Sequence, residues 1–181
     1  MSGNWEARFE ARILEASHGF ENDPAHDVAH FRRVVATAQR LAAAEGGQME
    51  VILPAAWLHD LVNVPKNDPR RSQASRLSAV AALAWLREAG YPEKFHTEIG
   101  HAIEAHSFSA AIEPKSIEAK IVQDADRLDG LGAVGVARVF AVSGLLRRKL
   151  YDLEDPFAAG GRRVDDLRFT IDHFYAKLFL T

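Results

Sequence analysis

Apolar residues recur every three or four positions along most of this chain, which is the spacing of one face of an α-helix. Trp5, Phe9 and Ile13 form the first such stripe. No segment alternates apolar and polar residues over several positions with many β-branched side chains, so the pattern predicts no β-sheet. Helices are expected over approximately these residues: 5–19, 25–45, 50–61, 72–89, 92–106, 116–129, 130–149 and 165–181.

Glycine and proline mark the breaks between these helices. Two adjacent glycines at 46–47 end the second helix, and residues 63–71 and 151–164 are expected to be loops. The helix over 50–61 is apolar around most of its circumference and is expected to be buried. The glycine-rich apolar segment 130–149 is expected to be a helix packed closely against a neighbour. We expect an all-α fold in a single domain, residues 1–181, which contains an N-terminal helix (1–20), a core (24–130) and C-terminal helices (131–181).

Composition narrows the class of protein. The chain has 181 residues, 48% of them apolar, which is enough for one domain with a substantial core. No apolar run approaches the ~20 residues that span a bilayer, and the acid-bearing N-terminus is unlike an export signal. We therefore expect a cytoplasmic protein with no membrane partner. A net charge of −3 argues against a nucleic-acid polymer as partner. The chain has no cysteine, which excludes disulfides and thiolate ligands, but it has eight histidines, and histidine is the commonest metal ligand.

An adjacent His59-Asp60 pair stands at the end of the predicted buried helix. A charged aspartate there is costly to bury unless it is paired or bound to a metal. Neighbouring residues on a helix point ~100° apart, so the two side chains converge on one ion only if it lies between them or beyond the helix end. Taken alone, the pair is equally compatible with a helix-end aspartate beside an ordinary core histidine.

Two other segments add candidate ligands. His26 and His30 are four residues apart, the spacing that places two side chains on one helix face. The segment IVQDADRLDG (121–130) holds three aspartates near the C-terminal end of a predicted helix, where the helix dipole disfavours carboxylates. Such a cluster needs a positive charge, which Arg127 or a divalent cation could supply.

The order of these residues resembles a known family. A histidine on one helix, a His-Asp pair on the next and a later aspartate match the H…HD…D signature of the HD phosphohydrolases. The resemblance runs from about residue 24 to the C-terminus. Over this range the chain is similar to a bacterial subgroup of uncharacterised HD hydrolases. It implies a compact helical HD-domain fold with metal ligands at His30, His59, Asp60 and Asp126. The blocks that carry it are HDVAHFRRVV, AAWLHDLVNVPKNDPRRSQAS, GHAIEAHSFSA and EAKIVQDADRLDGLGAVGVARVF.

The implied ligand set has a definite chemistry. Two imidazoles and two carboxylates suit one divalent transition metal (Mn, Fe, Co, Ni or Zn), and Mg is also compatible. Such a metal lowers the pKa of bound water and polarises a phosphoryl oxygen. The resemblance thus implies a metal-dependent phosphohydrolase in which metal-bound water attacks phosphorus. Some members hold a second metal with two further histidines. That arrangement is less favoured here, because His101 and His106 point about 140° apart on a helix.

Further side chains are assigned roles around this ligand set. Asp60, His106 and Glu104 are assigned to catalysis, with His106 contacting the substrate phosphate and Glu104 the weaker candidate for general acid–base work. The residues assigned to substrate binding are His26, Lys66, His101 and Arg127. The alternatives are a capping or surface role for His26, a structural role for His101 and a solvated loop around Lys66.

The sequence departs from the pattern of one group of HD enzymes at a position that bears on the substrate. Family members that act as deoxynucleotide 5′-nucleotidases carry an acid three residues after the His-Asp aspartate, and this chain has Asn63 there. The resemblance to the subgroup favours cleavage of a phosphoanhydride, such as pyrophosphate release from a nucleoside or deoxynucleoside triphosphate. The predicted partner is a small phosphorylated molecule, most simply a nucleotide.

Three other interpretations stay open. Asn63 also suits a non-catalytic HD domain that senses a nucleotide or a metal. The segment HDVAH (26–30) differs by one methylene from the H-E-x-x-H helix of zinc peptidases, a remote alternative because it leaves the His-Asp pair unexplained. The apolar chain end at 178–180 suggests a further helix or a docking surface such as a homo-oligomer interface.

Overall fold

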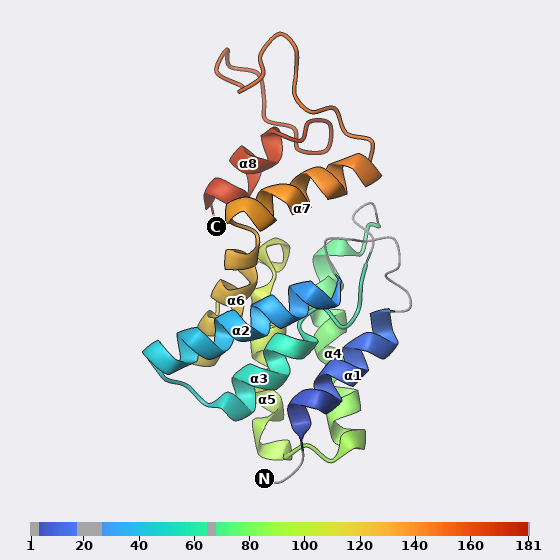
Figure 1. Ribbon diagram of the computed structural model, residues 1–181, viewed down its shortest axis with the longest axis vertical. Coiled ribbons are helices and arrows are strands. Elements are labelled where there is room, and N and C mark those ends of the chain that lie inside the picture. The colour runs from blue at the N-terminus through green and yellow to red at the C-terminus, as the bar shows by residue number, and fades with distance from the viewer. Residues whose placement is uncertain (1–3, 18–26, 65–67, 181) are drawn as a thin grey trace. The chain divides into compact units, whose positions relative to one another are not determined.

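The computed structural model describes residues 4–17, 27–64 and 68–180, and this part of the chain is built from helices and loops (Figure 1). Within these ranges there is no β-strand, and the one sheet-like contact is an isolated bridge between Lys149 and Phe169. The prediction of an all-α fold is therefore confirmed. The α-helices are α1 (Trp5–Ser17), α2 (Val28–Glu45), α3 (Met49–Leu58), α4 (Ala74–Ala89), α5 (His96–His106), α6 (Ile117–Asp129), α7 (Gly132–Leu145) and α8 (Asp172–Ala176). Single 3₁₀ turns form η1 (Arg71–Gln73), η2 (Glu93–Phe95), η3 (Phe108–Ala110) and η4 (Leu178–Leu180).

The chain divides into two compact units. The described part of the first unit runs from Asn4 to Leu128 and contains α1 to α5 and all of α6 except its last residue. The described part of the second unit runs from Asp129 to Leu180. The organisation of residues 1–181 as a single domain stays a prediction.

Helix α3 occupies the middle of the first unit. It contacts α1, α2, α4 and α5, and these neighbours surround it in Figure 1. Complete burial of a large aliphatic side chain contributes about 1.5–3 kcal/mol, so these contacts hold α3 firmly. The prediction of a buried helix is confirmed, and the helix end that carries the His-Asp pair is anchored in the core. The buried residues of α3 are Val51, Ile52, Pro54, Ala55, Ala56, Trp57 and Leu58.

Local signals set the bounds of α2. The carboxylate of Asp27 accepts a hydrogen bond from the backbone N–H of His30 (2.9 Å), so Asp27 is the N-cap and the helix begins at Val28, later than predicted. At the other end Gly46 has φ +88° and donates its N–H to the carbonyl of Ala42 (2.9 Å). A side chain at that φ would be strained, which explains why the predicted glycine stop is correct.

Helix α6 joins the core at both of its ends. Near its start, Glu118 accepts a hydrogen bond from the backbone N–H of Gln48, the N-cap of α3 (3.1 Å). Nearer its end, the buried Gln123 side chain donates to the carbonyl of Ala105 on α5 (2.6 Å). These two bonds hold α6 against the ends of α3 and α5, and they fix where the following turn of α6 lies.

The second unit differs from its prediction in α7. The segment 130–149 is helical only from Gly132 to Leu145, and its buried residues are Gly135, Val142 and Ser143. Gly135 lies so close to the carbonyl of Gly130 that a Cβ there would overlap it. The expectation of a helix with a closely packed apolar face was wrong, because most of its large apolar side chains are exposed. These are Val134, Val136, Phe140 and Leu145.

The predicted helix over 165–181 was also wrong. Residues 166–171 form turns around the bridge residue Phe169, and among the described residues after them only α8 and η4 are helical. The guanidinium of Arg162 pairs with both oxygens of the buried Asp172 carboxylate (2.6 Å each), and the N–H of Asp165 donates to the same group (2.6 Å). In a continuous helix, with a rise of 1.5 Å per residue, residues 165 and 172 would lie about 10 Å apart, so the contact between them is incompatible with a helix over this segment.

Among the described residues no single helix is long and apolar enough to cross a membrane. Helices α6 and α7 meet that test only when they are counted together across a bend. Ile121, Val122 and Ala125 of α6 are buried in the core of the first unit, and a core helix passes the same test.

Candidate metal centre

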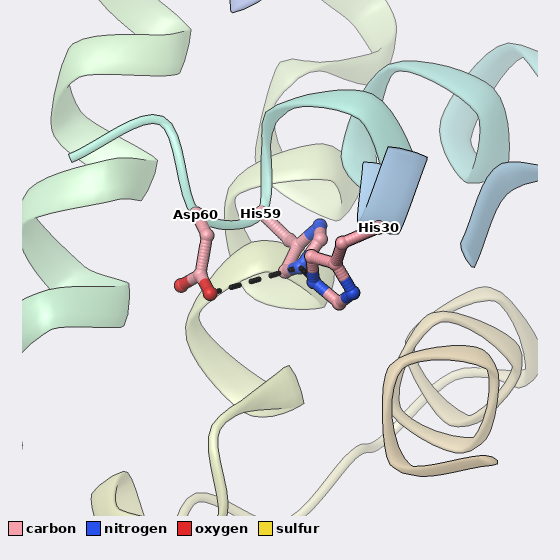
Figure 2. Close-up of side chains that lie close together, drawn as sticks. All are labelled: His30, His59 and Asp60. Atoms are coloured by element: carbon pink, nitrogen blue, oxygen red, sulfur yellow. Dashed lines mark hydrogen bonds and ion pairs between the residues drawn. The ribbon is translucent and has the colours of Figure 1, made fainter. Parts of the chain in front are cut away.

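Three of the four predicted ligands converge in the first unit. His30 from α2, and His59 and Asp60 from the end of α3, offer ligand atoms that all lie within 4.8 Å of one another (Figure 2). Asp126 of α6 belongs to the same cluster, because its Oδ1 is 3.6 Å from Nε2 of His30 and 3.7 Å from Nε2 of His59. The four residues therefore meet, although they come from α2, from the turn after α3 and from α6.

The adjacent His59 and Asp60 converge because the helix has ended. Helix α3 stops at Leu58, and the pair lies in the turn that follows. Oδ2 of Asp60 is 3.8 Å from Nε2 of His59, and Figure 2 shows the two side chains reaching the same point from the chain beyond the helix. This is the geometry that a ligand pair of neighbouring residues requires.

A backbone hydrogen bond orients the His59 ring. Its Nδ1 lies 2.9 Å from the carbonyl of Ala56, and a carbonyl can only accept, so the ring proton is on Nδ1. The Nε2 of the neutral ring then carries a lone pair directed toward His30, whose Nε2 is 3.3 Å away. Phe31 packs against the rings of both His30 and His59, at centroid distances of 5.4 and 5.2 Å. The two imidazoles are thereby held in place.

The protonation states favour a cation. Complete burial lowers the pKa of His59 to about 4, despite the opposing charges of Asp60 and Asp126. Burial alone would raise the pKa of the Asp126 carboxyl, but the nearby histidines outweigh it and lower that pKa. Near neutral pH the histidine is therefore neutral and the carboxylate ionised, which are the forms that bind metals.

The donor set fits a divalent ion. The Nε2 lone pair of His59 faces carboxylate oxygens at 3.7 and 3.8 Å, and electron-rich atoms of this kind repel one another unless a positive charge lies between them. Metal–ligand bonds of about 2.0–2.2 Å place neighbouring ligand atoms roughly 2.8–3.6 Å apart. The observed separations of 3.3–3.8 Å are close to that range.

His106 adds a fifth side chain to the cluster. It ends α5, is buried, and places Nε2 3.4 Å from Oδ1 of Asp60. Its Nδ1 lies 2.6 Å from the carbonyl of Ile103, the same arrangement that orients His59. Burial alone would lower the pKa of His106, but the hydrogen bond and charge of Asp60 outweigh it and raise that pKa. His106 and His59 thus lie near different oxygens of Asp60, Oδ1 and Oδ2 respectively.

The other predicted site residues lie in different surroundings. Nε2 of His101 accepts a hydrogen bond from the backbone N–H of Lys115 (2.9 Å), so it is engaged outside the cluster. Glu104 precedes His106 by two residues, about 160° around the helix from it. The guanidinium of Arg127 lies over the ring of Phe108, 5.6 Å from its centroid. His26 and Lys66 fall outside the described residues.

The aspartate cluster of segment 121–130 separates in the structure. Asp126 joins the histidines, Asp124 is exposed, and Asp129 pairs with Arg138 of α7. Arg127, which with a divalent cation was one of two possible counter-charges for the cluster, contacts Phe108. The three aspartates thus lie in different surroundings, because their positions on α6 point in different directions.

Two aromatic residues of the site were not predicted. Phe31 and Phe108 each lie within two residues of a site histidine, His30 and His106 respectively. Their nearness in sequence was the available signal, but an apolar side chain beside a ligand is ordinary in a core helix. Only the three-dimensional contacts with the imidazole rings and with Arg127 distinguish them.

This helical frame, with histidines and aspartates converging at the end of a buried helix, agrees with the family comparison. A model of the HD domain matches residues 27–131, more than half of the chain. The protein belongs to the HD-domain family.

A curated relative and solved structures are similar to this chain. The chain is 37% identical to the uncharacterized protein YpgQ of Bacillus subtilis over 130 residues, which cover 70% of this chain and 61% of YpgQ, less than two thirds of its length. It resembles the crystal structure of a Lactobacillus plantarum protein with a TM-score of 0.74 and 29% identity, over 99% of this chain and 82% of that one.

Two further crystal structures are also similar to this chain. An HD-superfamily hydrolase from Bacillus thuringiensis aligns with a TM-score of 0.63 and 34% identity, over 95% of this chain and 79% of that one. B. subtilis YpgQ in complex with ADP aligns with a TM-score of 0.68 and 29% identity, over 96% and 79% of the two chains. These likenesses agree with membership of the HD-domain family.

Proposed function

We propose that this protein is a metal-dependent phosphohydrolase that acts on a nucleotide and cleaves a phosphoanhydride, with pyrophosphate release from nucleoside triphosphates as the favoured reaction. The observation that carries the proposal is the convergence of His30, His59, Asp60 and Asp126. The ADP complex of the related YpgQ supports a nucleotide as the ligand.

Four side chains would hold the metal. The Nε2 atoms of His30 and His59 and the carboxylates of Asp60 and Asp126 are the donors. A divalent metal bound there would supply Lewis acidity, which makes water a better nucleophile and stabilises negative charge on phosphoryl oxygens. The partial exposure of the two carboxylates, 17% for Asp60 and 25% for Asp126, leaves the cluster open on the side from which a substrate would approach.

His106 would act on Asp60 and on the reacting phosphate. Its ring holds one carboxylate oxygen of Asp60, so the other oxygen stays directed toward His59. Its raised pKa keeps a proton available on the imidazole closer to neutral pH than burial alone would allow. No contact of Glu104 supports its assignment as an acid–base group, and that assignment stays a prediction.

The described residues offer no support for the peptidase alternative, whose first histidine, His26, lies outside them. In an H-E-x-x-H helix the acid between the histidines acts as general base. Here the acid at that position, Asp27, caps α2 by accepting the N–H of His30, and His30 contacts His59 and Asp126 in the cluster. The sensor alternative predicts the same ligands and differs only in turnover.

The test is a phosphate and pyrophosphate release assay over nucleoside mono-, di- and triphosphates, screened against Mn²⁺, Co²⁺, Ni²⁺, Zn²⁺ and Mg²⁺. We expect metal-dependent pyrophosphate release from triphosphates that is lost in Asp126→Asn. Asp124→Asn is the matched control, because it removes an exposed carboxylate from the same helix. Phosphate release from monophosphates alone would contradict the anhydride specificity. Metal and nucleotide binding without turnover would favour the sensor.

A further inference from the structure

Arg127 and Phe108 form a pair that lies next to residues of the metal centre in the sequence. Each follows a residue of the cluster closely in sequence: Arg127 comes directly after Asp126 on α6, and Phe108 is two residues after His106 in η3. The guanidinium lies over the phenyl ring, 5.6 Å from its centroid, within the range of a cation–π contact. The pair therefore connects α6, which carries Asp126, to the turn directly after α5, which carries His106.

The neighbouring contact on α6 fixes this position. Gln123 and Arg127 are four residues apart, so they share one face of α6. Gln123 donates to the carbonyl of Ala105, and Arg127 reaches Phe108, so this face follows the end of α5 into η3. Asp126 points about 100° away from Arg127 around the helix, toward the histidines. One turn of α6 thus presents a carboxylate to the metal site and a guanidinium beside it.

Arg127 lacks the partner that a half-buried cation normally has. Its Nε–H is buried and makes no hydrogen bond, and among the residues that the structure describes its guanidinium forms no ion pair. The removal of a charged group from water without a partner is costly, and one aromatic face compensates for only part of that cost. A guanidinium of this kind is suited to a phosphate, which it can bind through two parallel N–H···O bonds.

Building on the proposed function, we propose that Arg127, positioned by Phe108, binds a phosphate group of the substrate other than the one that reacts. The substrate is then a nucleoside di- or triphosphate and not a monophosphate. The reacting phosphate belongs at the four ligands, on the side of α6 that Asp126 faces. A second phosphate of the same chain would lie beside it, where the unpaired charge of Arg127 is available.

The experiment measures binding and not turnover. The probes are AMP and the α,β-methylene analogue of ADP, whose bridging carbon prevents cleavage between the phosphates. Titration calorimetry with the Mn²⁺-loaded protein compares the wild type with Arg127→Gln, Arg127→Lys and Phe108→Leu. The matched control is Lys120→Gln, which removes one positive charge from an exposed position of the same helix.

We expect the wild type to bind the diphosphate analogue more tightly than AMP. Arg127→Gln should weaken binding of the diphosphate by roughly 10- to 100-fold, the range for a lost hydrogen bond to a charged group, and change AMP binding less than twofold. The diphosphate affinity of Arg127→Lys should lie between those of the wild type and Arg127→Gln, because lysine keeps the positive charge but cannot form two parallel hydrogen bonds to one phosphate. Phe108→Leu should weaken the diphosphate by a few fold, and Lys120→Gln should match the wild type.

Equal losses for both ligands in Arg127→Gln would overturn the proposal, because they would place Arg127 at the reacting phosphate or in a structural role. Unchanged diphosphate binding in Arg127→Gln, or equal affinity of the wild type for the two probes, would overturn it as well. If the expected binding pattern is found but no nucleotide is hydrolysed with any metal, the recognition by Arg127 stands and the proposed phosphohydrolase activity fails.

Discussion

The hydroxyl of Tyr91 donates a 2.6 Å hydrogen bond to the backbone carbonyl of Glu50 in α3. In a regular helix that carbonyl would pair with the N–H four residues later, but this position is Pro54, which has none. Burial, and next the charge of Glu50, raise the pKa of Tyr91 to about 12, so the hydroxyl keeps its proton at any ordinary pH. A side chain from beyond α4 thus replaces the missing helix bond in the helix that carries the metal site.

Removal of this hydroxyl should destabilise the protein. Tyr91→Phe keeps the ring contacts of Tyr91 but leaves the Glu50 carbonyl without this donor, and we expect the free energy of unfolding to fall by about 1–3 kcal/mol. Urea unfolding followed by tryptophan fluorescence measures the change. Tyr151→Phe is the control, because it removes an exposed hydroxyl. Identical unfolding curves for Tyr91→Phe and the wild type would show that the bond contributes nothing.

Metal binding should stabilise the fold through Asp126. A ligand at 100 times its Kd adds about 2.7 kcal/mol to the stability of the state that binds it. We expect Mn²⁺ or Zn²⁺ to raise the melting temperature of the wild type, and Asp126→Asn to abolish most of that increase because it removes one anionic donor. Asp124→Asn should behave like the wild type. Thermal unfolding at several metal concentrations gives the comparison, and a full metal response in Asp126→Asn would remove Asp126 from the ligand set.

The contact between His106 and Asp60 should control metal affinity. Residues that hold a metal ligand in place typically contribute 10- to 100-fold in affinity, so His106→Gln should weaken metal binding by about that factor. His96→Gln is the control, because His96 is also buried on α5 but its ring contacts the carbonyl of Tyr91. We expect that variant to lose stability and keep metal affinity. Calorimetric titration separates the two effects, and equal metal affinity in both variants would contradict a role for His106.

The Arg162–Asp172 pair should make the second unit sensitive to acid. The hydrogen bonds from Arg162 are the main cause that lowers the pKa of the Asp172 carboxyl in the folded chain. A depressed folded pKa stabilises the protein above the unfolded value of about 3.9, and this contribution is lost as the pH falls through the folded pKa. Hydrogen exchange of residues 149–172, corrected for intrinsic rates, should therefore accelerate below about pH 4.

Asp172→Asn provides the check on that pH dependence. We expect this variant to show fast exchange over residues 149–172 already at pH 6, with little further change on acidification, because the ionised carboxylate is absent throughout. An acid response in Asp172→Asn equal to that of the wild type would assign the effect to another group.

Sequence periodicity predicted the helices of the first unit well because each buries one apolar stripe in a common core. The periodic pattern failed in the second unit, where residues 166–171 form turns around the bridge residue Phe169. Their apolar spacing is helical, but the deciding contact joins Arg162 to Asp172, and a pairing of side chains ten residues apart leaves no periodic signal. The exposure of the apolar residues of α7 was equally beyond a pattern that records only spacing.

The candidate site was predicted in its residues but not in its contacts. The resemblance to the HD family named His30, His59, Asp60 and Asp126, and the structure brings them together. The link from His106 to Asp60 and the position of Arg127 over Phe108 depend on how α5 and α6 lie against each other. That arrangement is set by bonds such as Gln123 to Ala105, which no local motif encodes.

The wide spacing of the cluster along the chain has a consequence for biosynthesis. His30 and His59 are 29 residues apart, and Asp126 follows only after α4 and α5. A nascent chain that has emerged from the ribosome as far as α5 already exposes three of the four donors but lacks the carboxylate that closes the set. With the proposed ligand set, complete capture of a metal requires α6 to be synthesised and packed against the core, which would make metal loading a late step in biosynthesis.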